Sequence, residues 1–321
     1  MCENYLFYRS SDKRKNKTPL YNSHASAYLS IDQPTTNTSK IYQTTIETLH
    51  SGGNKFTMDL IQTLVLAVIQ GITEWLPVSS TGHLNIARNC MGLSTVEPSY
   101  IFFDFVLHMG TLCVVLVAFR EDIVKILRAV IRRDFNTNEG KLALFIIVGS
   151  VPTAIIGFIL DFLFQKQFES LYLNLLTVGV ALPINGFVLY VSQLRRENEK
   201  LSYMDSLLVG IAQGVAIIPG ISRSGVTIST GLLRKVNKET AFKYSFLLSI
   251  PAVIGATIAE SRNLVVSNVD MAAMFLGVIT SMIVGYIFLK LLQKIVMKEK
   301  FHLFAYYCWI AGLIIIIYFS L

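Results

Sequence analysis

The composition of the chain is that of a membrane protein. Of its 321 residues, 53% are hydrophobic and only 15% are charged, whereas a soluble domain of this length would carry more charge. The formal net charge is +7, and no basic cluster outside the apolar segments is interleaved with aromatic residues. We therefore attribute the positive charge to loops on one side of a bilayer, and the composition argues against a nucleic-acid partner.

The first 57 residues differ from the rest of the chain. They are rich in Ser, Thr, Asn and Lys and show no apolar periodicity, so we interpret residues 1–57 as a disordered polar extension. No apolar core follows their early basic stretch, which argues against a signal peptide. The composition changes abruptly at Met58. Residues 58–321 are therefore predicted to form one polytopic membrane domain, and either the extension is genuine or translation starts at Met58.

Two apolar segments are each interrupted by a polar break. The first runs from Leu60 to about Met91 and is interrupted over residues 75–82, Trp-Leu-Pro-Val-Ser-Ser-Thr-Gly. The second runs from Ser206 to about Leu233 and is interrupted over residues 219–225, Pro-Gly-Ile-Ser-Arg-Ser-Gly. Because Pro removes a backbone donor and Ser or Thr caps the helix that follows, each segment is predicted to be two short helices joined at the break.

Six further apolar segments are long enough, or nearly so, to cross a bilayer as helices of roughly twenty residues. They lack the alternation of barrel strands, so we predict an all-α integral membrane protein. The six predicted spans are Ile101–Phe119, Leu142–Phe164, Leu171–Val191, Tyr244–Ala259, Met271–Leu289 and Phe301–Leu321.

Basic residues predict how the broken segments enter the membrane. The loops before and after the second broken segment are both basic, so both should lie in the cytoplasm and the segment should be a re-entrant hairpin. These basic residues are Arg195, Arg196, Lys200, Arg234, Lys235 and Lys238. Six spans and two hairpins then place both termini outside. An outside location opposes the seven basic residues of the extension, which favours a start at Met58.

The two broken segments resemble each other. Gln70-Gly71 stands twelve residues before Gly82, and Gln213-Gly214 stands twelve residues before Gly225. With one hairpin entering from each face, this is typical of an inverted repeat, in which a polar site forms where the broken helices meet. The sequence therefore predicts six transmembrane helices plus two re-entrant helical hairpins in an inverted repeat.

The breaks also collect the polar side chains from which a site could be built. A helix that starts at a break directs free N–H groups at an anion, and Arg223 adds a guanidinium that can bind phosphate oxygens with two donors. Hydroxyls at such places usually pack or cap, but charges at membrane depth are costly and usually functional. The residues near the first break are Gln70, Glu74, Ser79, Ser80, Thr81 and His83.

Asp104 and His108 lie four residues apart in the first predicted span. They could contact and orient the residues of the breaks, or they could hydrogen-bond to each other as a polar pair. We favour the polar pair.

These motifs resemble the signatures of the undecaprenyl-diphosphate phosphatase, or bacitracin-resistance, family. The first is Gln-Gly-Ile-Thr-Glu-Trp-Leu-Pro-Val-Ser-Ser-Thr-Gly-His over residues 70–83, and the second is Pro-Gly-Ile-Ser-Arg-Ser-Gly-Val-Thr over residues 219–227. The resemblance covers Met58 to Leu321. It implies hydrolysis of undecaprenyl diphosphate to the monophosphate at the outer face of the plasma membrane, resistance to bacitracin, and a divalent cation, Mg²⁺ or Ca²⁺. The family allows Gln or Glu at the position of Gln70.

The resemblance and the residues together suggest a mechanism. Ser80 attacks the terminal phosphorus, Glu74 or His83 takes its proton, Glu74 also binds the cation, and Arg223 stabilises the transferring phosphoryl group. Direct attack by water with His83 as base is an open alternative. The residues assigned to substrate binding are Gln70, Ser79, Thr81, Ser222, Ser224 and Thr227.

A polyprenyl-phosphate flippase or an anion transporter is the alternative function, because inverted repeats with half-helices are typical of transporters. Such a protein could bind an anion through Arg223 without needing Glu74, Ser80 and His83 together. The sequence leaves open whether the protein is a monomer or a homo-oligomer.

Overall fold

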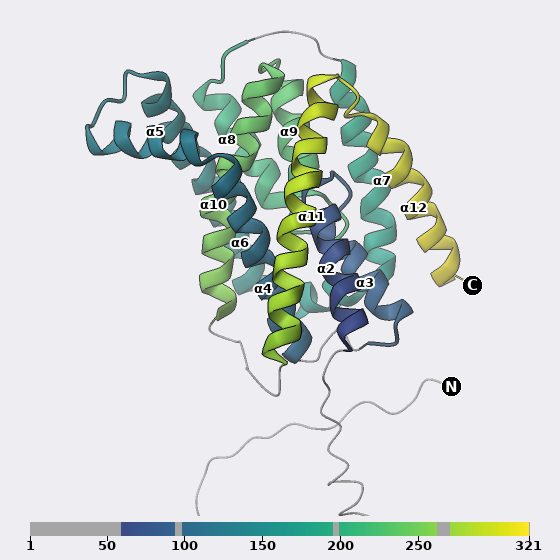
Figure 1. Cartoon of the computed structure of the whole chain (residues 1–321). Coiled ribbons are helices and arrows are strands. Elements are labelled where there is room, and N and C mark those ends of the chain that lie inside the picture. Colours follow the sequence, from purple (N-terminus) through teal and green to yellow (C-terminus); the bar gives the residue numbers. More distant parts are fainter. Residues whose placement is uncertain (1–58, 94–97, 195–198, 262–269, 321) are drawn as a thin grey trace, which may run out of the picture. The chain divides into compact units, whose positions relative to one another are not determined.

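The computed structural model describes residues 59–93, 98–194, 199–261 and 270–320, which belong to one compact unit of the chain (Figure 1). The extension at residues 1–57 lies outside the described residues. Within them the chain folds into eleven α-helices and a short 3₁₀-helix, Ser192–Leu194, so the all-α prediction is confirmed. The α-helices are α2 (Leu60–Trp75), α3 (Ser80–Cys90), α4 (Pro98–Ala118), α5 (Arg120–Ile131), α6 (Asn138–Leu173), α7 (Leu175–Val191), α8 (Tyr203–Val215), α9 (Arg223–Leu233), α10 (Lys238–Ser261), α11 (Met271–Met297) and α12 (Leu303–Ser320).

Each of the six predicted spans coincides with a helix, namely α4, α6, α7, α10, α11 or α12. Four helices in the described part are long and apolar enough to cross a membrane on their own: α6 up to Leu160, α10, α11 and α12. A fifth span results if α4 and α5 are counted as one bent pair, whereas α7 is a shorter apolar helix. Their outward faces carry large exposed apolar side chains, such as Phe158, Phe275 and Ile310. Such faces suit contact with lipid and not with water, as expected of an integral membrane protein.

Two boundaries differ from the sequence prediction. The loop expected after Phe164 is helical, because residues 158–173 contain neither Pro nor Gly, and α6 continues until Asn174 caps α7. The connection after the first span, expected as a loop, contains α5. This helix was missed because it is short and rich in charge.

The two broken segments are confirmed as pairs of short helices. In Figure 1, α2 and α3 turn back in the lower half of the helix bundle, and α8 and α9 turn back in the upper half. Ser79 and Ser222 cap the second helix of each pair, and their hydroxyls accept hydrogen bonds from the N–H groups of Gly82 and Gly225. Each break contains one residue with a positive φ, Ser79 at 69° and Gly220 at 96°.

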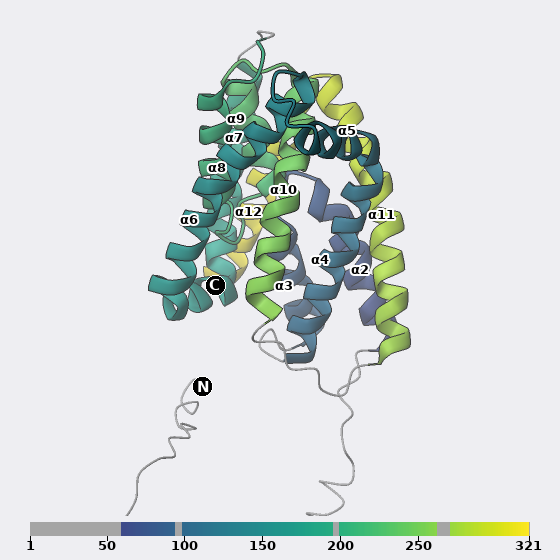
Figure 2. The same cartoon turned by 90° about the vertical axis from the view of Figure 1, so that its left-hand side faces the viewer.

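Small residues let the broken segments pack closely against long helices. α2 packs against α11 and α8 packs against α6, while α7 packs against α12. A Cβ atom on Gly71 would lie 2.8 Å from the backbone oxygen of Ser281, and one on Gly210 would lie 2.1 Å from that of Gly149. Figure 2 shows α6, α10, α4 and α11 side by side, which matches their pairwise packing.

We predict that Gly210→Ala destabilises the protein, because the new methyl group would meet the backbone of α6. Overpacking of this kind costs about 1–3 kcal/mol. The measurement is the midpoint of thermal unfolding in detergent. Gly255→Ala in α10 is the matched control, since a Cβ there meets nothing within 4 Å. Equal midpoints for the two variants would contradict the close α6–α8 contact.

Candidate functional site

The two breaks meet, although they are far apart in the sequence. The hydroxyl of Ser79 in the first break accepts a hydrogen bond from the backbone N–H of Gly220 in the second, at 3.1 Å. In the other direction, the hydroxyl of Ser224 donates to the backbone oxygen of Trp75 at 2.9 Å. The N-terminal ends of α3 and α9 therefore lie in one region, as the sequence predicted.

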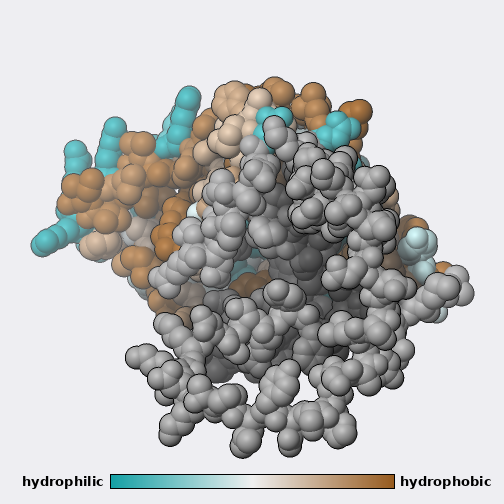
Figure 3. Space-filling model, turned by 90° about the horizontal axis from the view of Figure 1, so that it is seen from below, coloured by the Kyte–Doolittle hydropathy of each residue, from teal (hydrophilic) through white to brown (hydrophobic). Residues whose placement is uncertain are grey.

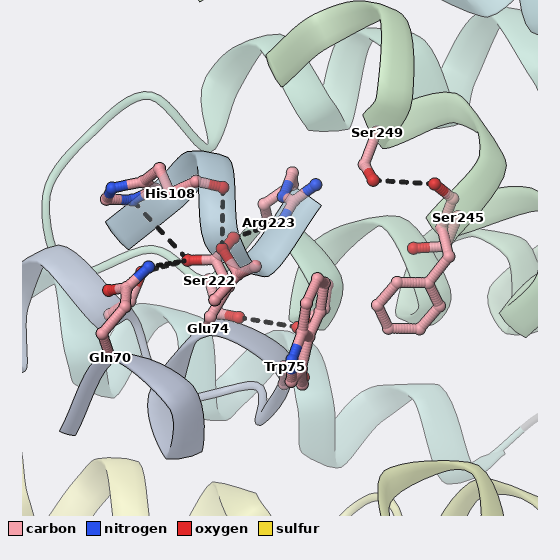
Figure 4. A network of polar contacts seen from close by, with 12 residues as sticks. Gln70, Glu74, Trp75, His108, Ser222, Arg223, Ser245 and Ser249 are labelled. Atoms are coloured by element: carbon pink, nitrogen blue, oxygen red, sulfur yellow. Dashed lines mark hydrogen bonds and ion pairs between the residues drawn. The ribbon is translucent and has the colours of Figure 1, made fainter. Parts of the chain in front are cut away.

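Glu74 is the centre of this region (Figure 4). Its Oε2 atom accepts hydrogen bonds from the Ser80 hydroxyl at 2.8 Å and from the Gln70 amide at 3.2 Å. Its Oε1 atom accepts one from the guanidinium of Arg223 at 2.5 Å. The structure thus brings together four residues that the sequence analysis singled out, from the three helices α2, α3 and α9.

The electrostatics of this cluster depend on Arg223. The side chain of Glu74 is only 7% exposed and that of Arg223 is 20% exposed. A carboxylate buried at this depth would be costly alone, and the guanidinium compensates it. Because Arg223 remains the more exposed partner, it can also reach an anion that enters from outside the pair.

The contacts of His108 correct the interpretation of Asp104 and His108 as a polar pair. Asp104 and His108 do not pair through their side chains. The carboxylate of Asp104 forms an ion pair with Arg88 of α3. The Nδ1 atom of His108 lies 2.8 Å from the backbone oxygen of Asp104, and its Nε2 atom lies 3.7 Å from Oε2 of Glu74. The four-residue spacing suggested a local pair, but α3 and α2 supply the partners.

His83 points away from the carboxylate. Its Nδ1 atom lies 2.7 Å from the backbone oxygen of Ser79, and its Nε2 atom lies 2.6 Å from the hydroxyl of Tyr307 in α12. The two rings are also stacked, with centroids 5.8 Å apart. Both nitrogens of His83 are therefore occupied by groups other than Glu74 and Ser80.

Most of the remaining predicted hydroxyls hold the breaks in place. Ser79, Ser222, Ser224 and Thr227 are buried, with at most 5% of their surface exposed. Ser222 lies 3.2 Å from Ser224, and Thr227 donates to the backbone oxygen of Arg223 at 2.7 Å. Thr81 differs, since it is half-buried in the first turn of α3 beside Ser80.

Asn185 of α7 is a residue that the sequence analysis missed. Its amide donates a hydrogen bond to the backbone oxygen of Pro77 in the first break at 2.8 Å. Its amide oxygen accepts one from the backbone N–H of Ser222 in the second break at 3.1 Å. The side chain is 1% exposed. A polar residue inside an otherwise apolar predicted span was the signal that could have identified it.

The cluster offers few ligands for a cation. Among the described residues, no three His, Cys, Asp or Glu side chains gather closely enough to hold a metal ion by themselves. Beside Glu74, however, the Oε1 atom of Gln70 is buried and lacks a hydrogen-bond partner within the described part of the chain. One carboxylate and one amide oxygen suit a hard cation such as Mg²⁺, which usually takes its other ligands from water and from substrate phosphates.

The chain is similar to known proteins over nearly all of its described helices. Residues 63–314 match the family model described as bacitracin resistance protein BacA. The chain is 39% identical over 269 residues to the undecaprenyl-diphosphatase of Carboxydothermus hydrogenoformans, covering 81% of this chain and 97% of that protein. It is 39% identical over 267 residues to the undecaprenyl-diphosphatase of Halothermothrix orenii, covering 81% and 98%. It is 41% identical over 273 residues to that of Desulfosudis oleivorans, covering 79% and 97%.

We predict that Asn185→Leu lowers the midpoint of thermal unfolding, because it leaves the Pro77 oxygen and the Ser222 N–H buried without their partner. A buried polar group that loses its hydrogen bond costs about 1–3 kcal/mol. Ile184→Leu is the control, since the neighbouring side chain on the same helix is 54% exposed. If both variants unfold at the temperature of the unmodified protein, Asn185 does not hold the breaks together.

Proposed function

Because the chain belongs to the bacitracin resistance protein BacA family, we propose that it hydrolyses undecaprenyl diphosphate to undecaprenyl phosphate and inorganic phosphate. The relatives that carry this activity in their names match it over almost their entire lengths. The observation that supports the activity best is the 2.8 Å hydrogen bond from the Ser80 hydroxyl to Glu74, whose other oxygen meets Arg223. A nucleophile, its base and a guanidinium that can bind phosphate are thus adjacent. The product would return the lipid carrier to cell-envelope synthesis, and the activity would confer bacitracin resistance.

The first chemical step is attack by Ser80. Its Oγ atom bonds to the terminal phosphorus while its proton passes to Oε2 of Glu74. The bond between that phosphorus and the bridging oxygen breaks, and undecaprenyl phosphate leaves with this oxygen. In the second step water attacks the phosphorus of the phosphoserine, the bond between phosphorus and Oγ breaks, and the proton of Glu74 returns to Oγ. Phosphate leaves as H₂PO₄⁻ with the oxygen and both hydrogens of the water.

Arg223 neutralises the charge that develops on the transferring phosphoryl group. Without substrate, the guanidinium of Arg223 is paired with Glu74. The diphosphate would compete with Glu74 for this guanidinium, which is already held at the site. Gln70, which donates to Glu74, would bind the diphosphate together with Thr81 and the first N–H groups of α3 and α9. Ser79, Ser222, Ser224 and Thr227 support this binding by holding the two breaks.

Two alternatives are less well supported by these contacts. Direct attack by water would need His83 as base, but both of its nitrogens are engaged by Ser79 and Tyr307. A flippase or anion transporter would use the half-helices and Arg223. It would have no need for a serine hydroxyl directed at a buried carboxylate.

The protein would supply only some of the ligands of a divalent cation at this site. Glu74 and the free amide oxygen of Gln70 would hold it, with the remaining ligands coming from the substrate and water. When bound, Mg²⁺ or Ca²⁺ would neutralise charge on the diphosphate oxygens.

The membrane arrangement that we propose is six spans and two re-entrant hairpins in an inverted repeat. Its support is a repeated packing pattern. Gly71 follows Gln70 and meets α11, and Gly214 follows Gln213 and meets α6. The Gln-Gly pair of each hairpin therefore marks the place where its first helix approaches a long helix.

The orientation follows from charge. The α5–α6 connection, the mouth of the α8–α9 hairpin and the α11–α12 connection lie at one end of the bundle, at the top of Figure 1. Within the described part of the chain, most basic residues belong to the helix ends and connections at this end, among them Arg128, Arg234 and Lys298, so we place it in the cytoplasm. The α2–α3 hairpin then opens to the outside of the plasma membrane, where the substrate would enter.

Thiol labelling tests this orientation. In a chain whose only cysteine is Cys90, which is exposed at the end of α3, we expect reaction with an impermeant reagent on whole cells. In a cysteine-free chain carrying Asn136→Cys, an exposed position between α5 and α6, reaction should require lysis. The reverse order would overturn the outward-facing site.

The activity itself is tested by phosphate release from undecaprenyl diphosphate in detergent. We expect Glu74→Gln to lower the rate by about 10²–10⁴-fold, because an amide cannot accept the proton of Ser80. Gln70→Glu should remain active, since it keeps an oxygen ligand and adds no bulk. Equal, near-normal rates for both variants would show that Glu74 is structural.

Ser80→Ala separates the phosphatase from the alternatives. It should abolish phosphate release while substrate binding and the unfolding midpoint stay close to those of the unmodified protein. A variant that still releases phosphate at the full rate would point to direct attack by water. An unmodified protein that moves the lipid across a bilayer without releasing phosphate would support the flippase.

A further inference from the structure

Helix α5 leaves the bundle at an angle that its neighbours do not share. The axes of α4 and α5 differ by 76°, with only Phe119 between the two helices. Figure 1 shows α5 projecting sideways at the upper end of the bundle, and Figure 2 shows it lying across the ends of the long helices. Because α4 runs through the membrane, α5 lies close to the membrane plane.

The sequence of α5 divides its surface into three faces. The inner face is attached to the bundle through buried Ala129 and through Asp122, whose carboxylate accepts from Lys243 of α10 at 3.0 Å. A second face is apolar and open: Val124, Leu127 and Ile131 are 43%, 54% and 79% exposed. A third face carries exposed charges, at Glu121, Lys125, Arg128 and Arg132.

The open apolar face is turned toward the flank of the bundle that lipid would cover. Figure 3 looks up at the bundle from the end opposite α5, and the underside of the projecting part at its left is hydrophobic, with hydrophilic side chains at the outer edge. An apolar stripe below and charges at the side and above suit a helix lying in the membrane interface.

We propose that α5 is an interfacial helix that binds the anionic lipid surface of the leaflet at this end of the bundle. Leu127 and its apolar neighbours enter the acyl chains just below the headgroups, and the basic side chains contact lipid phosphates. Residues 120–134 contain five basic and three acidic residues, and one of the acidic residues, Asp122, is already paired with Lys243. The excess positive charge matches an anionic leaflet.

A second copy of the chain is a poorer occupant of this face. In a two-fold contact the same surface of each copy faces the other, so a contact through Val124, Leu127 and Ile131 would cover the apolar face and would not by itself give the basic side chains beside it an anionic partner. Lipid meets the apolar and the basic face at the same time.

The test measures the surroundings of two adjacent positions. A fluorophore is attached to Leu127→Cys or Arg128→Cys in a cysteine-free chain, which is placed in nanodiscs that hold one copy each. We expect the probe at 127 to be quenched by doxyl-labelled lipid and the probe at 128 by iodide in the water. Val151→Cys on α6, where the native side chain is 53% exposed, is the lipid control, and Asn136→Cys is the water control.

Quenching of the 127 probe by iodide as strongly as at position 136 would overturn the interfacial placement. In vesicles that hold several copies, protection of the 127 probe from both quenchers, absent in single-copy nanodiscs, would show a second copy on this face and would also overturn it.

The headgroup part of the proposal has its own test. Nanodiscs of phosphatidylcholine alone are compared with nanodiscs that also contain phosphatidylglycerol. For the probe at 127 we compare quenching by doxyl-labelled lipid with quenching by iodide. We expect phosphatidylglycerol to raise the ratio of the first to the second severalfold. The combined variant Lys125→Gln, Arg128→Gln, Arg132→Gln and Arg133→Gln should lose this increase and keep its unfolding midpoint. If phosphatidylglycerol has no effect on the unmodified helix, α5 does not recognise anionic lipid.

Discussion

Backbone that leaves a helix inside a bilayer must find its hydrogen-bond partners within the protein. The two breaks of this chain solve that problem together. Ser79 accepts from Gly220, Ser224 donates to Trp75, and Asn185 bonds to both breaks. Neither break could satisfy these groups alone, so the site exists only when the two hairpins meet.

The same constraint explains why charges are tolerated at the meeting point. Glu74 is buried, and Arg223 from the opposite hairpin compensates it at 2.5 Å. The pair joins the hairpins, places a carboxylate beside the hydroxyl of Ser80, and leaves the guanidinium of Arg223 as the more exposed partner. Glu74 also accepts hydrogen bonds from Ser80 and Gln70, and Nε2 of His108 lies 3.7 Å from its Oε2 atom.

The small residues around the breaks have a related role. Gly71 brings α2 against α11, and Gly210 and Gly214 bring α8 against α6. Between α6 and α8 the Thr153 hydroxyl also donates to the backbone oxygen of Gly210 at 2.8 Å. Each short hairpin is held at a fixed depth by its close contact with a long helix. A half-helix that lacked this contact could not keep its position.

The sequence by itself determined the described helices other than α5, the places where two apolar segments break, and the position of Glu74 and Arg223 at these breaks. Apolar length, Pro and Ser at the breaks, and the cost of a buried charge are local properties that can be read from the chain. Only the tertiary structure decided which partners these residues meet. Ser80 and His83 are three residues apart on one helix, yet Ser80 faces Glu74 and His83 faces Tyr307. The rotation of α3 about its axis depends on what α2, α7 and α12 present to it. The same reason accounts for Asn185, for His108 and for the ion pair of Asp104 with Arg88, since each of these contacts joins helices whose relative placement no local pattern specifies.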